Sequence, residues 1–339
     1  MAQGTSVEYV EHSFSPWWGC SRTSPGCARC FAADNARRWG QGSLWHLHGP
    51  RRVVSENQWR QPLKWNRDAQ REGRLARVLC GTMCDVFEDH PAVGAARARL
   101  FGLIEATPWL AWCLFTKRPE NAGGMVPWGG AWPGNAWLIA SVENQDWAGA
   151  RIPVLLATAA PVRGLSVEPM LGPVDLAAAG AWPAGGGVDW VIVGGESGPR
   201  ARPMHPQWAR NLLAQCDAHS TPAWFKQHGE WGPAEWKVER RAGEDAAAYV
   251  KRAAATGATH AYAADAHLLG HHPVPATQQP WSGERAALAD GLAPIRRWGK
   301  GKAGHLLDGR EVAGLPAAAH RTPPPTPHQR ELRLDYSPP

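Results

Sequence analysis

A series of short apolar segments, each ending in polar or charged residues, constrains the fold of this 339-residue chain more than any other feature. Each segment has the length and nearly continuous hydrophobicity of a strand that is buried on both faces, as in a parallel sheet. Helix-like stretches separate several of the segments, and their spacing of about 25 to 30 residues is typical of βα units. The segments are 77–85, 109–117, 136–143, 161–168, 188–196 and 222–227, with a further strand expected before Cys20.

This alternation predicts an α/β fold in which parallel strands form a partial or complete (β/α) TIM-like barrel, with a Cys-rich N-terminal loop and a peripheral C-terminal segment. A doubly wound open sheet is the alternative. Helices are expected at 91–106, 146–157 and 207–218, and a loop at 172–187. The expected divisions are a barrel domain at 1–235, a peripheral insertion and C-terminal segment that packs on the barrel at 236–315, and a Pro-rich flexible tail at 316–339.

Charged residues recur at the carboxyl ends of the predicted strands, where barrel proteins place their active sites. Packing explains such a series poorly, whereas a polar site on one face of the barrel explains it well. Asp85, Lys117 and Lys226 are the candidate catalytic residues in this series. The alternative is a set of structural ion pairs in which glutamates contact lysines and arginines of the same rim. The glutamates are Glu143, Glu168 and Glu196, and their possible partners are Lys117, Arg118, Arg163 and Lys226.

Three cysteines near the N-terminus, Cys20, Cys27 and Cys30, predict a metal site. They lie in a turn-rich loop before a predicted helix at 28–39, so the thiolates can converge and the positive end of the helix can face them. Thiolates select zinc or iron–sulfur clusters. Three protein ligands leave one iron of a [4Fe–4S] cluster open, whereas structural zinc requires a fourth ligand. The residues that could complete a zinc site are His46, His48 and Cys84.

The chain contains no apolar segment of the roughly 18 residues that a membrane-spanning helix needs, and its first ten residues show no secretory signal. We therefore expect a cytoplasmic protein without membrane contact. In the reducing cytosol, an odd number of cysteines, seven here, indicates metal or redox sites before disulfides. Cys80, Cys113 and Cys216 are expected to be buried structural residues.

A net charge of +6 and a sequence pI near 9.1 are compatible with a nucleic-acid partner. The 20 tryptophans could stack on bases, although core packing is the commoner role of this residue. The chain lacks the motifs of P-loop NTPases, serine hydrolases with a nucleophile elbow and zinc proteases, which removes support for those three classes.

Seven motifs spread over residues 12–315 carry a resemblance to a known family. Examples are Pro-Trp-Trp-Gly-Cys at 16–20 and Ser-Val-Glu-Pro at 166–169, and the others lie at 24–30, 114–119, 190–198, 224–227 and 302–310. Together they resemble the phage three-cysteine-motif family of unknown function, named after phage gp thirty-seven and gp sixty-eight. That family is in turn similar to radical S-adenosylmethionine (SAM) enzymes, among them the spore photoproduct lyases.

The resemblance implies a [4Fe–4S] cluster on Cys20, Cys27 and Cys30. SAM would chelate the open iron, an electron donor would reduce the cluster, and SAM cleavage would yield a 5′-deoxyadenosyl radical. The same resemblance implies that Ser141, Glu143, Ser166, Glu168, Gly194, Gly195 and Glu196 bind the cofactor at the strand ends.

A nucleic acid or nucleotide is the expected substrate class of such an enzyme. The chain departs from the usual radical-SAM spacing of Cys-x3-Cys-x2-Cys, because six residues separate Cys20 from Cys27. The alternative function is a zinc-stabilised nucleic-acid-binding or DNA-processing protein that carries out no SAM chemistry.

Overall fold

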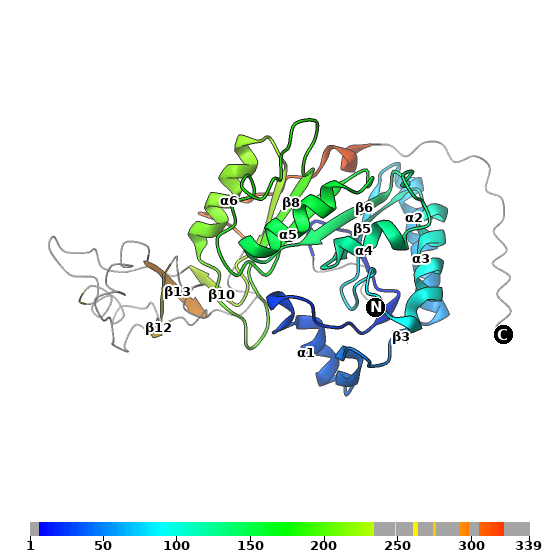
Figure 1. Cartoon of the computed structure of the whole chain (residues 1–339), viewed down its shortest axis with the longest axis horizontal. Coiled ribbons are helices and arrows are strands. Elements are labelled where there is room, and N and C mark those ends of the chain that lie inside the picture. The colour runs from blue at the N-terminus through cyan, green and yellow to red at the C-terminus, as the bar shows by residue number, and fades with distance from the viewer. Residues whose placement is uncertain are drawn as a thin grey trace.

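The fold is known from a computed structural model that describes residues 7–233, 248, 260–263, 274–275, 292–297 and 305–321. Seven parallel strands form one sheet that curls into a half-barrel with helices packed against it (Figure 1). In spatial order the strands are β1 (His12–Phe14), β4 (Ala76–Cys80), β5 (Leu110–Thr116), β6 (Ala136–Ser141), β7 (Arg163–Val167), β8 (Trp190–Gly194) and β9 (Ala223–Gln227).

The order of the strands decides between the two predicted architectures. From one edge of the sheet to the other, the seven strands follow their order in the chain. A doubly wound sheet would reverse its order at a switch point, and this sheet does not. The prediction of a partial barrel is therefore confirmed and the doubly wound alternative is wrong.

Six helices accompany the described part of the sheet: α1 (Phe31–Arg38), α2 (Glu56–Glu72), α3 (Gly94–Ala106), α4 (Pro119–Met125), α5 (Gln145–Leu156) and α6 (Pro206–Ala218). The prediction located α1, α3, α5 and α6 but not α2 or α4. Helix α2 begins with a capping box between Ser55 and Gln58 and ends at Gly73 in the left-handed conformation. Its polar composition and the internal Pro62 concealed it in the sequence.

Alternate side chains of the strands fill two separate cores. On the helix-covered face, β5 contributes Leu110, Trp112 and Leu114 to the larger core. On the concave face it contributes Ala111 and Cys113 to a smaller, aromatic core. Strands buried on both faces need the continuous hydrophobicity by which they were recognised.

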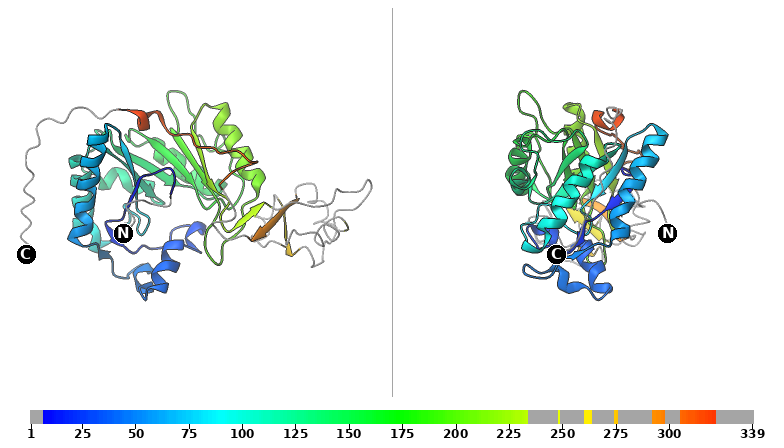
Figure 2. Two further views of the ribbon diagram at one scale, coloured as in Figure 1. Left: turned by 180° about the vertical axis from the view of Figure 1, so that it is seen from behind. Right: turned by 90° about the vertical axis from the view of Figure 1, so that its right-hand side faces the viewer.

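Both ends of the described chain close the concave face (Figure 2). Tyr9 packs edge-on against Trp190, with ring centroids 5.6 Å apart. From the other end, the segment around Ala313 pairs antiparallel with the edge strand β9 at Trp224. The indole nitrogen of Trp190 donates a hydrogen bond of 2.8 Å to the carbonyl of Gly314. The N- and C-terminal segments thus share one core with the strands between them.

Residues 15–55, here called the cysteine cap, lie across the carboxyl ends of the first strands (Figure 1). A short antiparallel pair, β2 (Trp17–Trp18) and β3 (Arg52–Val53), joins the two ends of the cap. The amide of Gly19 donates to the carbonyl of Met83 in the loop after β4. The cap carries all three cysteines of the predicted metal site and α1.

A second, antiparallel sheet has the order β10 (Trp231–Pro233), β13 (Leu292–Arg297), β11 (His260–Ala263) and β12 (Val274–Pro275). Strands β11, β12 and β13 lie in the predicted peripheral segment at 236–315, whereas β10 lies in the predicted barrel domain at 1–235. The rest of the peripheral segment up to residue 304 lies outside the described residues, residue 248 excepted. Residues 322–339 of the predicted tail also lie outside them. Within the described parts of the chain, no helix is long and apolar enough to cross a membrane.

Candidate functional site

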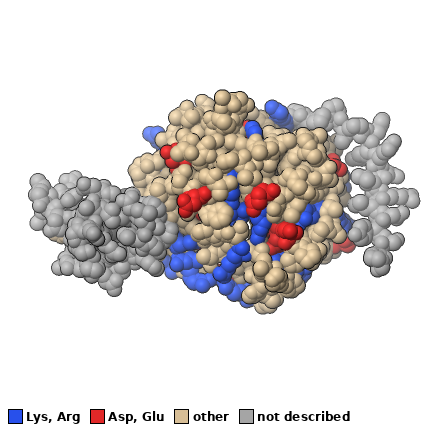
Figure 3. All heavy atoms as spheres, viewed as in Figure 1, with Lys and Arg blue, Asp and Glu red and all other residues tan. Residues whose placement is uncertain are grey.

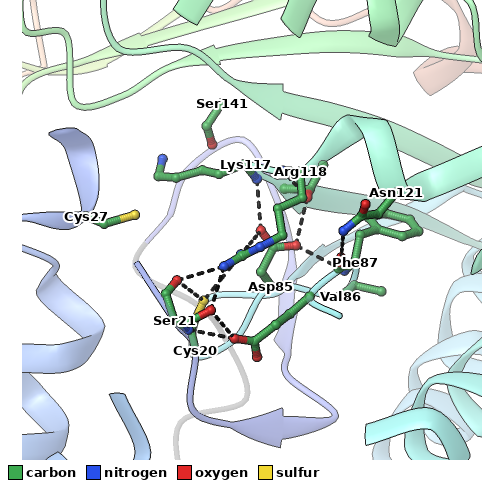
Figure 4. Close-up of polar contacts among 12 residues, drawn as sticks. Cys20, Ser21, Cys27, Asp85, Val86, Phe87, Lys117, Arg118, Asn121 and Ser141 are labelled. Carbon is green, nitrogen blue, oxygen red and sulfur yellow. Dashed lines mark hydrogen bonds and ion pairs between the residues drawn. The ribbon is translucent and has the colours of Figure 1, made fainter. Parts of the chain in front are cut away.

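A cavity of about 190 Å³ lies between the cysteine cap and the carboxyl ends of β4, β5 and β6. The cap contributes Cys20, Cys27 and Cys30 to its wall. The strand ends contribute Asp85, Lys117 and Ser141, which follow or end three successive strands (Figure 4). The structure therefore brings the three cysteines together with three of the predicted strand-end residues.

The local sequence shapes the cysteine loop. Pro25 begins a short 3-10 turn that ends at Cys27, whose amide donates a hydrogen bond of 2.9 Å to the carbonyl of Ser24. Cys30 occupies the N-cap position of α1, so the positive end of that helix follows the third cysteine directly. Ser24 Oγ lies 3.9 Å from Cys27 Sγ. The predicted arrangement of a turn-rich loop followed by a helix is confirmed.

A buried ion pair between Asp85 and Arg118 supports the loop from the barrel side. Arg118 Nη1 lies 2.9 Å from Asp85 Oδ2 and 3.8 Å from Cys20 Sγ. Arg118 Nη2 donates to the carbonyl and hydroxyl oxygens of Ser21 at 2.9 and 2.8 Å (Figure 4). Asp85 also accepts hydrogen bonds from the Thr116 hydroxyl and the Lys117 amide, at 2.7 and 3.0 Å. Arg118 thus ties the first cysteine to the ends of two strands.

A second buried pair, Glu88 with Arg51, extends this network through the cap. One oxygen of Glu88 accepts from the amide and the hydroxyl of Ser21, both at 2.7 Å. Arg51 donates to both oxygens of Glu88 at 2.8 Å and also to the carbonyls of Leu44 and Gly49. Burial alone would raise the pKa of Glu88, but the hydrogen bonds from Arg51 and Ser21 hold it below the usual value. Glu88 is therefore a buried anion that organises the cap.

Glu143 is completely buried and contacts the cysteine loop directly. Its Oε1 accepts from the hydroxyl of Ser24 at 2.6 Å and lies 3.0 Å from Lys117 Nζ, while its Oε2 lies 3.0 Å from Arg151 Nη1. Burial opposes its charge, but Lys117 and Arg151 lower its pKa. A Cβ at Gly26 would lie only 2.5 Å from Oε1 of Glu143, so the loop needs a glycine there to rest on this carboxylate.

Glu196 makes the third connection to the loop. Arg202 donates to both of its oxygens, with distances of 2.8 Å from Nε and 2.6 Å from Nη2. The same guanidinium donates to the carbonyl of Pro25 at 3.1 Å. The carboxylate predicted to bind a cofactor is thus engaged by an arginine that also positions the cysteine loop.

The thiols lie beside two positive charges. Burial and then Asp85 raise the pKa of the Cys20 thiol, whereas Arg118 acts to lower it. Burial opposes the charge on Lys117, but Glu143 and Cys27 raise its pKa, so the ammonium stays protonated. A metal bound to a thiol removes its proton outright, and the resulting negative charge would have Arg118 and Lys117 beside it.

Other predicted site residues do not line this cavity: they are Glu143, Ser166, Glu168, Gly194, Gly195, Glu196 and Lys226. Glu168 and Lys226 pair with each other, with 2.5 Å between Oε1 and Nζ. A Cβ at Gly195 would lie 2.0 Å from the carbonyl oxygen of His228, so close backbone packing accounts for that glycine. Ion pairs therefore occur at this rim, as the alternative interpretation expected.

The described side chains around the cavity do not form a complete binding site for a single metal ion. Among the described residues, no group of three or more His, Cys, Asp or Glu side chains is arranged to hold a single metal ion. His46 and His48 are exposed and do not line the cavity. Cys84 does line it, and burial raises the pKa of its thiol above the usual value, as it does for Cys20. All seven cysteines are free thiols, and Cys80, Cys113 and Cys216 are buried as predicted.

Several residues of this site escaped prediction: three lie within the cysteine loop but are not thiols, and four lie outside the motifs. They are Ser21, Ser24, Gly26, Arg51, Glu88, Arg151 and Arg202. Arg118 was noted only as a possible partner in an ion pair. The sequence holds one signal of these buried ions, which is the cluster of acidic residues after β4, Asp85-Val-Phe-Glu-Asp89. Two of its three carboxylates are buried, and a buried carboxylate needs a cation or hydrogen-bond donors as partners.

Comparison with known proteins identifies the family of this chain. The model of the family described as "Protein of unknown function (DUF5131)" matches residues 4–316. No curated protein and no solved structure matches the chain. The resemblance to the phage three-cysteine-motif family and to radical SAM enzymes stays a prediction. Because the match extends from the segment before β1 to the segment beyond β9, over nearly the whole length of the chain, the protein belongs to the DUF5131 family.

Proposed function

We propose that this protein is a radical-SAM-like iron–sulfur enzyme of phage or mobile-element origin, with a nucleic acid or nucleotide as its substrate. One observation carries the proposal: the three cysteines of the cap line one cavity at the carboxyl ends of parallel strands. This is the end at which α/β barrels gather their reactive groups. Cys20, Cys27 and Cys30 would hold the [4Fe–4S] cluster.

The number of cysteines in the cap favours a cluster over a single zinc ion. Structural zinc needs four ligands, whereas three thiolates leave one iron of a [4Fe–4S] cluster open. His46 and His48 are exposed outside the cavity, so neither lies with the three cysteines as a fourth ligand. Cys84 lines the cavity and is the remaining candidate for a fourth ligand of zinc.

The charges around the cavity also fit an anionic metal cluster. Arg118 contacts Cys20 and Lys117 lies close enough to Cys27 for the two charges to interact. Hydrogen bonds and positive charges near the sulfurs stabilise a cluster in its reduced, more negative form. When bound, the cluster and SAM would supply reductive cleavage of SAM to a 5′-deoxyadenosyl radical, given an electron donor.

The protein's own contribution would be to position the groups and to exclude water. Arg118, Glu143 and Arg202 each hold a different part of the cysteine loop through the Ser21, Ser24 and Pro25 positions. Lys117 and Ser141 are two of the polar residues that line the cavity and would contact a ligand there. That Ser166, Glu168, Gly194, Gly195 and Glu196 bind SAM, and that Asp85 and Lys226 act in catalysis, remain parts of the proposal. We also propose a cytoplasmic location, because seven free thiols suit a reducing compartment.

Anaerobic purification followed by iron, sulfide and zinc analysis tests the metal assignment. We expect about four irons and four sulfides per chain, with a brown colour that reduction by dithionite bleaches. Cys30→Ala should lose most of the iron. Cys216→Ala is the matched control, because Cys216 is buried on α6 away from the cavity. A colourless protein with one zinc and no iron would overturn the cluster and favour the zinc-stabilised alternative.

A second experiment tests the SAM chemistry. The cluster-loaded protein, dithionite and SAM should release 5′-deoxyadenosine, which liquid chromatography detects. Protein with a full cluster that releases none of this product would contradict the radical-SAM assignment and leave a cluster with an electron-transfer or structural role.

A further inference from the structure

The cysteine cap carries nearly all the net charge of the protein. Residues 15–55 contain six arginines and one aspartate, a net charge of +5, whereas the whole chain has +6. Arg51 is buried, but Arg22, Arg37, Arg38 and Arg52 are exposed. Figure 3 shows Lys and Arg side chains gathered on the lower part of the molecule, beside the region that α1 occupies in Figure 1. The positive charge is thus concentrated on the element that holds the cysteines.

The same cap exposes most of the large apolar side chains that reach the surface. Of the five exposed large hydrophobic residues in the described chain, Phe31, Trp39, Leu47 and Val53 belong to the cap. Trp39 is 57% exposed, and the other described tryptophans are buried or half-buried. The exposed apolar side chains of the described chain are thus concentrated on the element that also carries the positive charge.

Two aromatic rings and one arginine lie against one another on this surface. The rings of Trp18 and Trp39 lie with centroids 5.4 Å apart and planes tilted by 34°. The guanidinium of Arg52 lies over the ring of Trp18, 4.5 Å from its centroid. Two neighbouring aromatic rings with a guanidinium over one of them suit a ligand that is itself a flat ring joined to a phosphate.

We propose that the cysteine cap binds single-stranded nucleic acid, with Trp39 stacking on an unpaired base and with Arg37, Arg38 and Arg52 contacting phosphates. A duplex keeps its bases stacked inside and offers no face to an exposed indole ring, whereas an unpaired strand does. An acidic protein could meet the arginines but would leave the rings of Trp18 and Trp39 unused. This inference rests on the proposed function and adds the substrate class to it, namely single-stranded nucleic acid.

Two hollows beside α1 give such a strand a route across the cap. Arg22 and Ala32 line the cysteine cavity, so the basic surface reaches its wall. Phe31 and Arg38 line a second hollow of about 300 Å³. The acidic groups there are already engaged: Asp34 pairs with both Arg37 and Arg200, and Glu230 accepts from the amide of Gly198. A strand lying along α1 would therefore pass from the second hollow to the metal cavity.

Fluorescence anisotropy of the full chain with labelled 20-nucleotide probes tests this inference. The probes are single-stranded DNA, single-stranded RNA and the DNA duplex of the same sequence, each titrated at several salt concentrations. We expect at least one of the two single strands to bind tightly and the duplex to bind more weakly than that strand. The better of the DNA and RNA arms identifies the sugar that the cap prefers.

Variants identify the surface. Arg37→Ser/Arg38→Ser should weaken single-strand binding roughly tenfold or more and reduce the slope of log K against log salt by about 1.4, because two phosphate contacts are lost. Trp39→Ala should weaken it roughly 5- to 100-fold, and Trp39→Phe should retain most of the affinity. Arg60→Ser/Arg67→Ser is the matched control, since both arginines are exposed on α2 outside the cap.

An equal loss in the α2 control, an unaltered Trp39→Ala variant, duplex binding as tight as single-strand binding, or no binding at all would overturn the inference. Metal analysis of the same samples separates this result from the proposed chemistry. A zinc-loaded protein that binds single strands through Trp39 contradicts the radical enzyme and supports the cap surface. A cluster-loaded protein that binds no strand overturns the cap surface alone.

Discussion

Two pairs of opposite charges at the same rim of the half-barrel have very different surroundings. Asp85 and Arg118 follow β4 and β5, with 2.9 Å between their charged atoms, and both side chains are at most one-tenth exposed. Glu168 follows β7 and Lys226 lies on β9, with 2.5 Å between their charged atoms, and both are about one-fifth exposed. In the sequence the two pairs look alike, since each places a carboxylate and a cation at the carboxyl ends of buried strands. In the sheet, β4 and β5 are neighbours, whereas β8 separates β7 from β9.

The difference lies in what else each pair contacts. Arg118 donates to Ser21 and contacts Cys20, and Asp85 accepts further hydrogen bonds from Thr116 and Lys117 within the rim. Glu168 and Lys226 pair with each other beside Gly194, outside the cysteine cavity. A charged residue at a strand end can therefore be placed at the rim of the half-barrel from the sequence. Whether it takes part in a site depends on the loop that folds over the rim. Four predictions test this contrast.

The largest effect is expected from Arg118→Met. The variant would leave Asp85 as a buried charge without its cation, and Ser21 would lose its hydrogen bonds from Arg118. The free energy of unfolding should therefore fall by about 3–5 kcal/mol. Urea denaturation followed by tryptophan fluorescence, with a chelator present in every sample, measures this loss. A loss below 1 kcal/mol would show that the pair is no more important than an exposed one.

The double variant Asp85→Asn/Arg118→Met controls for the loss of bulk. Because it removes the unpaired charge, its destabilisation should be smaller than the sum of the two single changes by at least about 1 kcal/mol. Additive losses would indicate that the two groups act independently.

Gly26→Ala should have the next largest effect. The new Cβ would collide with Glu143 at 2.5 Å, and the loop must move, which should cost about 1–3 kcal/mol and reduce metal content. Gly149→Ala on α5 is the matched control, because a Cβ there meets nothing within 4 Å and should stabilise the helix by about 0.5–1 kcal/mol. If the two variants unfold at the same urea concentration, the loop does not rest on Glu143.

A pH dependence is expected from His228, directly after β9. Burial lowers the pKa of this histidine, while its hydrogen bond to the Leu306 carbonyl acts in the opposite direction. The unfolded chain therefore takes up the proton first, and stability should fall as the pH drops below about 6.5, by at most about 1.4 kcal/mol per pH unit for this group.

His228→Gln should flatten that dependence between pH 7 and 5.5 in urea denaturation. His12 also has a pKa lowered by burial, so a part of the slope should remain. An unaltered slope in the variant would assign the effect to other groups.

The smallest effect is expected from Lys226→Met. A half-buried pair with access to water contributes little, so the free energy of unfolding should change by less than about 1 kcal/mol and the metal content should stay the same. A loss of iron in this variant would place Lys226 in the metal site and remove the contrast with Arg118.

The barrel could be predicted because its strands are buried on both faces. Residues such as Leu110 to Leu114 and Trp190 to Val193 must all be apolar, so the strands stand out without any knowledge of their neighbours. The turn-rich loop with Cys20, Cys27 and Cys30 could be predicted because its residues are also close together in the sequence, within eleven positions.

The supports of the loop could not be predicted because they depend on contacts between distant residues. Arg118 is 97 positions from Ser21, and Arg202 is 177 positions from Pro25. Glu143 was predicted to be a cofactor ligand from its place after β6, but its partners, Ser24, Lys117 and Arg151, become neighbours only when the cap folds. Helix α2 was missed because its ordering depends on burying one side against the sheet, and its composition is polar.

The closure of the concave face by both ends of the chain has a consequence for synthesis on the ribosome. Trp137, Trp190 and Trp224 emerge long before Gly314 and Leu315, which complete the core around them. Until the C-terminal segment leaves the exit tunnel, the nascent half-barrel presents these indole rings to solvent and to chaperones. Emergence of the segment around Gly314, rather than completion of β9, is then the event that allows the sheet to reach its final packing.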